Sequence, residues 1–176
     1  MYGQSSGSVW KAGIARVVIT PQQDMWMAGY AARTKPAEGK LHDLWAKALV
    51  LEDGEGKQAV LITADLIGFN KYLSDRIRDK LHIEFNLSRD KIILSGSHTH
   101  TGPALQALPD KYLTVKDSSG EYSSSHLRLI KDYTERLESE IVELVREAIS
   151  SAEPVKLFSG QGVARFAVNR RYNGSK

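Results

Sequence analysis

QAVLITADL, at residues 58–66, is apolar enough to form a β-strand that is buried on both faces of a sheet. From residue 70 the period changes, because Leu73, Ile77 and Leu81 recur every four residues and predict an amphipathic helix. A second short apolar run, KIILSGS at residues 91–97, predicts another buried strand. Strand, helix and strand in this order form a βαβ unit, whose strands pair in parallel through a right-handed crossover.

The sequence before this unit adds antiparallel strands. WAKALVLE at residues 45–52 is separated from the first strand of the unit by DGEGK, which has the composition of a turn, so the two strands are expected to form a hairpin. KAGIARVVI at residues 11–19 is β-branched and stops at Thr20 and Pro21, which predicts a strand that ends in a turn. The resulting sheet is mixed.

The sequence after the unit predicts one long helix and further strands. Pro154 ends the helix, and residues 155–168 are expected to form one or two strands. Two segments without a period, residues 21–44 and 104–125, are expected to be long loops. The apolar positions of the helix, three and four residues apart, are Leu127, Ile130, Tyr133, Leu137, Ile141, Leu144, Val145 and Ala148. The predicted fold class is α/β, a layered mixed sheet flanked by helices.

Composition limits the classes of protein to consider. With 176 residues, 41% of them hydrophobic, the chain can form one compact domain, which we place at residues 11–176 after a flexible leader at residues 1–10. The 24 basic and 21 acidic residues are scattered, which argues against nucleic acid as a partner. The absence of cysteine leaves only nitrogen or oxygen ligands for a metal. No apolar run approaches the ~20 residues of a membrane span, and residues 1–10 lack the apolar core of a signal peptide.

LSGSHTHTGP, at residues 94–103, places two of the five histidines one residue apart. Side chains alternate along an extended backbone, so His98 and His100 are expected to point the same way and to lie close enough to share a ligand. If residues 91–96 form a central parallel strand, the histidines follow its carboxyl end, where α/β sheets place ligand crevices. Neutral imidazole binds Zn²⁺ well, and a catalytic zinc site uses three protein ligands and one open position. The pair is therefore part of a candidate zinc site.

The alternative is that the histidines are exposed or hydrogen-bonded structural residues. The context favours a functional pair, because small hydroxyl side chains alternate with the histidines and a Gly-Pro turn follows them, an arrangement suited to holding imidazoles in fixed tautomers. Asp65 either orients a histidine ring or caps a turn, and the sequence leaves both open. An apolar cluster in the first loop, which fits packing on the core better than an acyl-chain groove, contains Met25, Trp26, Met27 and Tyr30.

The segments GIARVVITP, MAGY, HDLWAKALVLED, VLITADL and IILSGSHTHTGP occur in an order that resembles the amino-terminal catalytic region of the neutral/alkaline non-lysosomal ceramidase family. The resemblance runs from residue 13 to about residue 170, and HTHTGP preceded by LSGS is its most specific element. It implies a Zn²⁺-dependent hydrolase that cleaves the amide bond between a fatty acyl chain and a sphingoid base. It also implies a lipid amide as the partner and a secreted or periplasmic location, and it leaves open peripheral contact with a membrane surface and the oligomeric state.

The resemblance also implies roles for individual residues. His98 corresponds to a zinc ligand, and His100 to a residue beside the metal that polarises the substrate or carries a proton. AVNRR, at residues 167–171, resembles the family's Asn-Arg stretch, so Arg170 is expected to bind the acyl carbonyl or the carboxylate product. The family's other zinc ligands, a histidine, a glutamate and a tyrosine, belong to segments beyond the position equivalent to Lys176. The chain is thus expected to be the front portion of a larger enzyme, with little activity and weak zinc retention by itself.

Two other functions are compatible with the sequence. The first is another His-x-His metallohydrolase, which would act on phosphoesters or cyclic amides. The second is a non-catalytic module that binds a lipid or a glycan without a metal.

Overall fold

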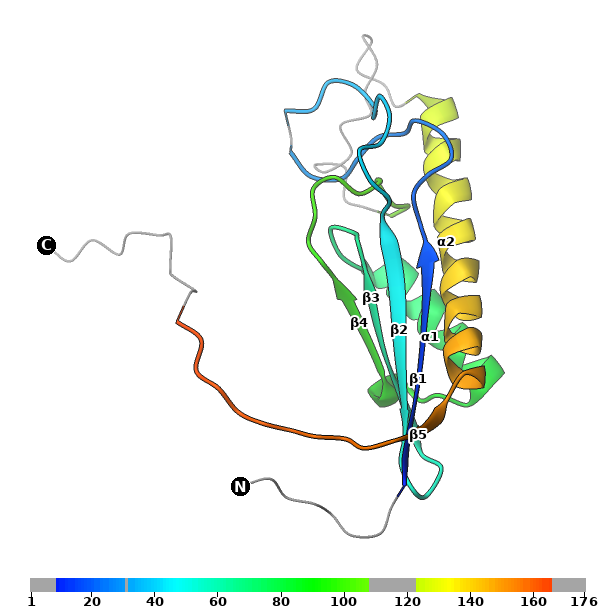
Figure 1. Ribbon diagram of the computed structural model, residues 1–176. Helices are drawn as coiled ribbons and strands as arrows, with labels where there is room; N and C mark the ends of the chain where they lie inside the picture. The colour runs from blue at the N-terminus through cyan, green and yellow to red at the C-terminus, as the bar shows by residue number, and fades with distance from the viewer. Residues whose placement is uncertain (1–8, 31, 108–122, 166–176) are drawn as a thin grey trace, which may run out of the picture.

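The computed structural model describes residues 9–30, 32–107 and 123–165, which form one five-stranded sheet and two long helices (Figure 1). The strand order is β4-β3-β2-β1-β5; β3 and β4 are parallel and the other pairs are antiparallel. The mixed α/β sheet predicted from the sequence is confirmed. The elements, in chain order, are β1 (Trp10–Val18), β2 (Trp45–Glu52), β3 (Gln58–Ala64), α1 (Lys71–Phe85), the 3₁₀ turn η1 (Arg89–Lys91), β4 (Ile92–Gly96), α2 (Ser124–Ser150) and β5 (Glu153–Val155).

The hairpin and the βαβ unit form as predicted, and local contacts fix their ends. In the turn between β2 and β3, the Asp53 side chain accepts hydrogen bonds from the backbone N–H groups of Glu55 and Lys57, each at 2.9 Å. Asn70 caps the start of helix α1, where its side chain accepts a hydrogen bond from the backbone N–H of Leu73. Asn86 caps the end of the helix with a left-handed φ of 55°. The chain then returns to the sheet as β4, parallel to β3.

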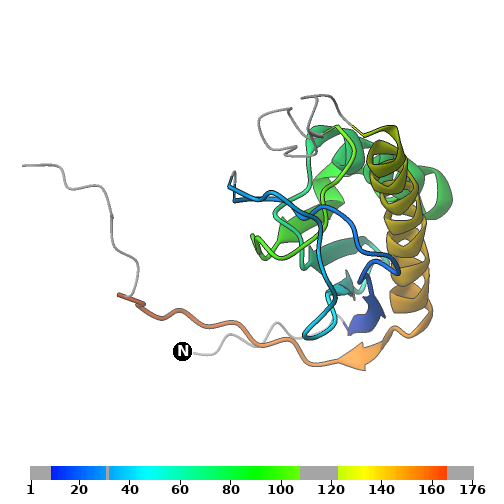
Figure 2. The same cartoon turned by 90° about the horizontal axis from the view of Figure 1, so that it is seen from above.

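Both helices lie on the same face of the sheet, and the views in Figures 1 and 2 agree on this. Helix α2 packs on β1 and β2, and α1 packs beside α2. The approach of α2 to β1 is so close that a Cβ on Gly13 would lie 1.8 Å from the Ala148 carbonyl oxygen, so only glycine fits there. The buried side chains between sheet and helices include Val50, Ile62, Leu73, Ile77, Leu81, Leu137, Ile141 and Leu144.

One ion pair joins the two helices inside this layer. Glu138 of α2 is 1% exposed, and its carboxylate receives Arg76 Nε at 2.5 Å and Lys80 Nζ at 2.7 Å. Burial alone raises the pKa of Glu138, but the hydrogen bonds and charges of Arg76 and Lys80 outweigh burial and hold this pKa below its usual range.

The predicted burial of β3 and β4 is wrong for one face of the sheet, because the helices cover only the other face. Neither β3 nor β4 is buried on both faces: Val60 and Ile62 of β3 are buried while Thr63 is exposed, and Ile93 of β4 is 58% exposed. Strand β4 also lies at the edge of the sheet rather than at its centre, since within the described ranges it pairs only with β3.

The predicted strands at residues 155–168 are also wrong over their described part. The strand there is β5, which pairs with residues 10–12 of β1, and residues 156–165 have no regular structure. Beyond β5 the chain has left the edge of β1, so it no longer finds backbone hydrogen-bond partners in the sheet. At the other terminus, β1 begins at Trp10, the last residue of the predicted leader, and residues 1–8 lie outside the described residues.

Helix α2 begins at Ser124, three residues before the predicted apolar stripe. Seven of the eight stripe residues are buried in the core. The exception, Leu127 in the first turn, is 40% exposed. Within the described ranges, neither long helix combines enough length with enough apolar character to cross a bilayer.

Candidate functional site

The histidine segment lies where β3 and β4 end side by side. After β4, the Ser97 N–H donates a hydrogen bond to the Ala64 carbonyl oxygen at the end of β3, at 3.0 Å. Next to it, a Cβ on Gly96 would lie 2.9 Å from the Gly68 Cα, so the two chain segments that follow the strands are in direct contact. The parallel strands thus bring the residues after β3 within reach of the histidines.

The backbone of His98 is left-handed, with a φ of 58°, and its ring is fixed by one hydrogen bond. The Nδ1 atom lies 2.8 Å from the carbonyl oxygen of Ile67 in the segment after β3. A carbonyl oxygen can only accept, so Nδ1 carries the proton of the neutral ring and Nε2 keeps its lone pair. His98 is an exposed residue, so its Nε2 atom can bind a cation.

His100 lies beside His98, with 5.2 Å between the ring centroids and 70° between the ring planes. The two imidazoles are close together as predicted, but the extended backbone expected between them is wrong, because His98 turns the chain with its positive φ. The Nδ1 atom of His100 is buried and has no hydrogen-bond partner in the part of the chain that the structure describes. Such a nitrogen is costly to leave unpaired, so the ring has capacity for a further ligand or proton.

The first loop holds His100 in place. Gly29 has a φ of 77°, and a Cβ there would lie 2.6 Å from both Cγ and Nδ1 of His100. The Tyr30 ring packs against the imidazole, with 4.6 Å between centroids. Arg33 Nη2 donates to the His100 carbonyl oxygen at 2.5 Å, and its Nε donates to the Gly29 carbonyl oxygen at 3.2 Å. The loop and the histidine segment therefore form one structural unit.

Sequence reasoning missed Gly29 and Arg33 as supports of this site. The glycine stands in MAGY, and a glycine in a loop is a candidate for left-handed backbone. No pattern in the sequence distinguishes Arg33 from the other arginines.

The structure distinguishes between the interpretations that the sequence left open. Met25 and Trp26 are 4% and 6% exposed, so these two loop residues pack on the core, the interpretation that the sequence favoured over an acyl-chain groove. Tyr30 is 63% exposed and contacts the histidine instead. The Asp65 carboxylate accepts a hydrogen bond from the backbone N–H of Trp45 at 2.9 Å, so it joins the end of β3 to the start of β2 instead of orienting a histidine or capping its own turn. The ring of His98 is oriented by a carbonyl group. Arg170 lies outside the described residues.

The described residues fit part of a metal site. His98 offers an imidazole nitrogen, a ligand type that zinc accepts in a cysteine-free chain, and His100 lies beside it. The residues that the structure describes contain no group of three or more histidine, aspartate or glutamate side chains that could hold a metal ion. A tetrahedral zinc site would thus need further donors in addition to this pair.

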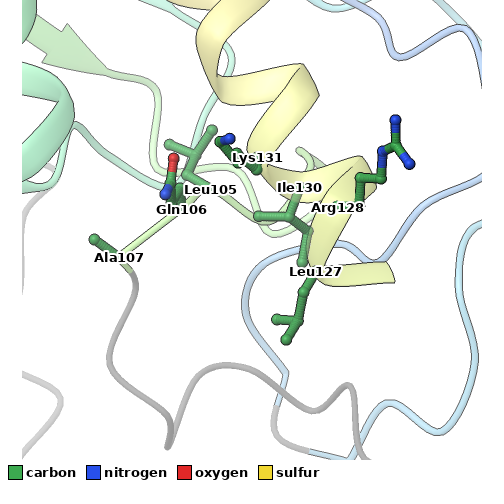
Figure 3. A pocket seen from close by; sticks show the side chains of 7 residues that line it. All are labelled: Leu105, Gln106, Ala107, Leu127, Arg128, Ile130 and Lys131. Carbon is green, nitrogen blue, oxygen red and sulfur yellow. The ribbon is translucent and has the colours of Figure 1, made fainter. Parts of the chain in front are cut away.

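A separate cavity of about 340 Å³ lies between the start of α2 and residues 105–107, which follow the Gly102–Pro103 turn (Figure 3). Leu105, Leu127 and Ile130 make its wall largely apolar. Neither histidine lines this cavity, so it is distinct from the histidine pair. The other lining residues are Gln106, Ala107, Arg128 and Lys131.

Comparison with known proteins gives a consistent result. The chain is 24% identical over 160 residues to a neutral ceramidase of Oryza sativa subsp. japonica, which covers 89% of this chain and 19% of the relative. It is 26% identical over 165 residues to neutral ceramidase A of Dictyostelium discoideum, which covers 90% of this chain and 21% of that one. The fold matches the crystal structure of neutral ceramidase from Pseudomonas aeruginosa with a TM-score of 0.67 at 19% identity, over 85% of this chain and 23% of that chain.

The chain thus spans about a fifth of the length of the relatives that it matches. Residues 10–173 match the family described as neutral/alkaline non-lysosomal ceramidase, N-terminal, which is nearly the whole chain. This chain therefore belongs to the neutral/alkaline non-lysosomal ceramidase family and corresponds to its N-terminal part.

Proposed function

We propose that this chain supplies part of the active site of a zinc-dependent hydrolase that cleaves the N-acyl amide bond of ceramide-like lipids. The observation that carries the proposal is the orientation of His98: the Ile67 carbonyl holds Nδ1–H and leaves Nε2 free, 5.2 Å from a second imidazole in ring-centroid distance. Family membership supplies the reaction type. Because His98 alone cannot complete a zinc site, the proposal includes further ligands from polypeptide outside these 176 residues.

Each residue has a separate task in this mechanism. His98 would hold the zinc ion through Nε2, and the ion, when bound, supplies a nucleophile at neutral pH and polarises the amide carbonyl. His100 lies beside His98 and would donate a hydrogen bond to the developing oxyanion or a proton to the leaving amine. Arg170 would bind the acyl carbonyl or the carboxylate product. Export from the cytosol belongs to the same proposal because the family resemblance implies it. Contact with a membrane surface belongs to it because a lipid amide resides in membranes.

The proposal is tested by measuring zinc content and hydrolysis of N-acyl sphingosine on the natural protein purified from the organism that produces it. His98→Asn removes the imidazole while tolerating the left-handed backbone, so it is expected to fold. Zinc affinity should fall by more than about 100-fold, since even residues that only orient a ligand contribute 10–100-fold. His100→Ala should keep the zinc and lose the activity.

His42→Ala is the matched control, because His42 is an exposed loop histidine whose ring, among the described residues, hydrogen-bonds to the Asp43 carbonyl oxygen. Zinc content and activity should be unchanged in this variant. Normal hydrolysis by His98→Asn would refute the proposal. Lipid binding that persists in a chelator, with no hydrolysis in any variant, would instead favour a non-catalytic binding module. Tight stoichiometric zinc in the 176-residue chain alone would contradict the need for further ligands.

A further inference from the structure

The sheet face opposite α1 and α2 carries a continuous apolar row. The strand register places Ile14, Leu49, Leu61 and Ile93 next to one another across β1, β2, β3 and β4. These positions alternate with buried positions such as Val50 and Ile62, so they point away from the helices. A second row beside the first is also apolar. We call the two rows together the open face, formed by Ala12, Ile14, Leu49, Leu51, Ala59, Leu61 and Ile93.

The open face is poorly suited to water. Ile14 is 73% exposed and Ile93 is 58% exposed, at opposite sides of the four strands. A sheet face that remains in solvent normally carries polar side chains, and the two rows of this face are apolar instead. Apolar patches of this kind mark interaction surfaces.

The row beside the apolar rows, toward the histidines, carries two basic residues on β1 and β2. Arg16 and Lys47 are partners in the register, and both side chains are exposed. Neither has an ion-pair partner within the described ranges, and the Arg16 guanidinium lies 5.0 Å from the centre of the Trp45 ring. A surface that fits this face is therefore apolar in its middle and acidic at the side nearest the histidines.

We infer that the open face is an interface for a second layer of polypeptide, equivalent to the part of the ceramidase relatives that this chain does not span. Two observations favour this occupant over a second copy or a lipid surface. The solved relative that shares the fold has only 23% of its chain matched here. The described chain also leaves the sheet after β5 as an extended segment that packs on neither helix, and it exposes Leu157 and Phe158 by 52% and 71% (Figure 1).

This inference is argued from the length of the relatives and from the exposed sheet face. Its test does not depend on zinc binding or on catalysis.

The chain has no cysteine, so a single introduced cysteine reports on a single position. The variants are Ile14→Cys and Ile93→Cys on the open face, with Ile83→Cys on α1 as the control, because Ile83 is 80% exposed. The measurement is the rate of reaction with a maleimide under native conditions.

In the protein as its host produces it, Cys at positions 14 and 93 should react at least about tenfold more slowly than at position 83, because the added layer must open before the reagent enters. The 176-residue chain alone should show no such difference. Lys47→Glu should raise the rate at both open-face positions, whereas Lys57→Glu in the β2–β3 turn should not.

Three results would overturn the inference. Equal rates at the three positions in the host protein would show that nothing covers the face. Protection of the 176-residue chain that grows with its concentration, together with a doubled mass in solution, would assign the face to a second copy. Protection that requires added phosphatidylcholine vesicles would assign it to a lipid surface.

Discussion

Gly29→Ala tests how the first loop holds His100. A Cβ at this position would lie 2.6 Å from two atoms of the imidazole, whereas carbon atoms in contact lie ~3.5–4.0 Å apart. The ring must therefore move, and it is confined by Tyr30 on one side. The φ of 77° adds a cost, because alanine disfavours left-handed backbone.

The expected magnitude follows from these two costs. Left-handed backbone destabilises the folded state by about 1–2 kcal/mol when the residue is alanine. Alanine also lowers the conformational entropy of the unfolded chain, which offsets about 0.4–1 kcal/mol of this cost. Displacing the imidazole in a packed site costs a further 1–3 kcal/mol or so. Gly29→Ala should therefore lower the free energy of unfolding by about 3 kcal/mol, measured by urea unfolding with tryptophan fluorescence.

Gly56→Ala is the matched control, because Gly56 has almost the same φ, 79°, and no atom lies within 4 Å of the position that its Cβ would take. Its expected cost is the backbone cost alone, about 1 kcal/mol. In addition, His100→Ala should make Gly29→Ala as mild as the control, since the obstructing ring is gone. Equal costs of Gly29→Ala and Gly56→Ala in the otherwise unchanged chain would refute the contact.

Two further predictions concern the helix layer. Glu138→Gln should cost about 2 kcal/mol at neutral pH, less than the ~3–5 kcal/mol of a fully buried pair, because Arg76 and Lys80 are 45% and 41% exposed. The pKa of Glu138 is depressed in the folded state, so the stability that its carboxylate contributes is complete above the unfolded pKa of ~4.3 and is lost as the pH falls through the folded pKa. A difference in the free energy of unfolding between the unchanged chain and Glu138→Gln that persists below the folded pKa would contradict this. Tyr133→Phe removes the 2.8 Å hydrogen bond from the phenol to the Ile19 carbonyl and should cost about 1 kcal/mol in urea unfolding, and an unchanged midpoint would contradict it.

The elements that the sequence predicts well are those whose contacts are local. The four-residue spacing in α1 produces its buried stripe directly, and Asp53 closes its turn with residues two and four positions away. The arrangement of layers is different, since nothing in the periodicity of β3 or β4 shows that α1 and α2 lie on one face. That choice depends on packing between residues far apart in the chain, such as Gly13 and Ala148.

The same distinction holds at the candidate site. The spacing of His98 and His100 indicates a pair, but the partners that orient them come from 31 and 67 residues away. One partner is the carbonyl group of Ile67, and a backbone carbonyl has no signature in a sequence. The left-handed φ of His98 is equally hidden, because histidine occupies that region only where other contacts stabilise it.

The pairing of β1 with β5 has a practical consequence for the design of fusion proteins. Trp10 and Val155 are register partners on adjacent strands, so the polypeptide enters and leaves this sheet within about 5 Å. Figure 1 shows that these entry and exit points lie at the end of the sheet remote from the segment that follows β4. Such neighbouring points suit a domain to insertion within a host chain or to tethering on a resin, with its opposite end left free to meet molecules from solution.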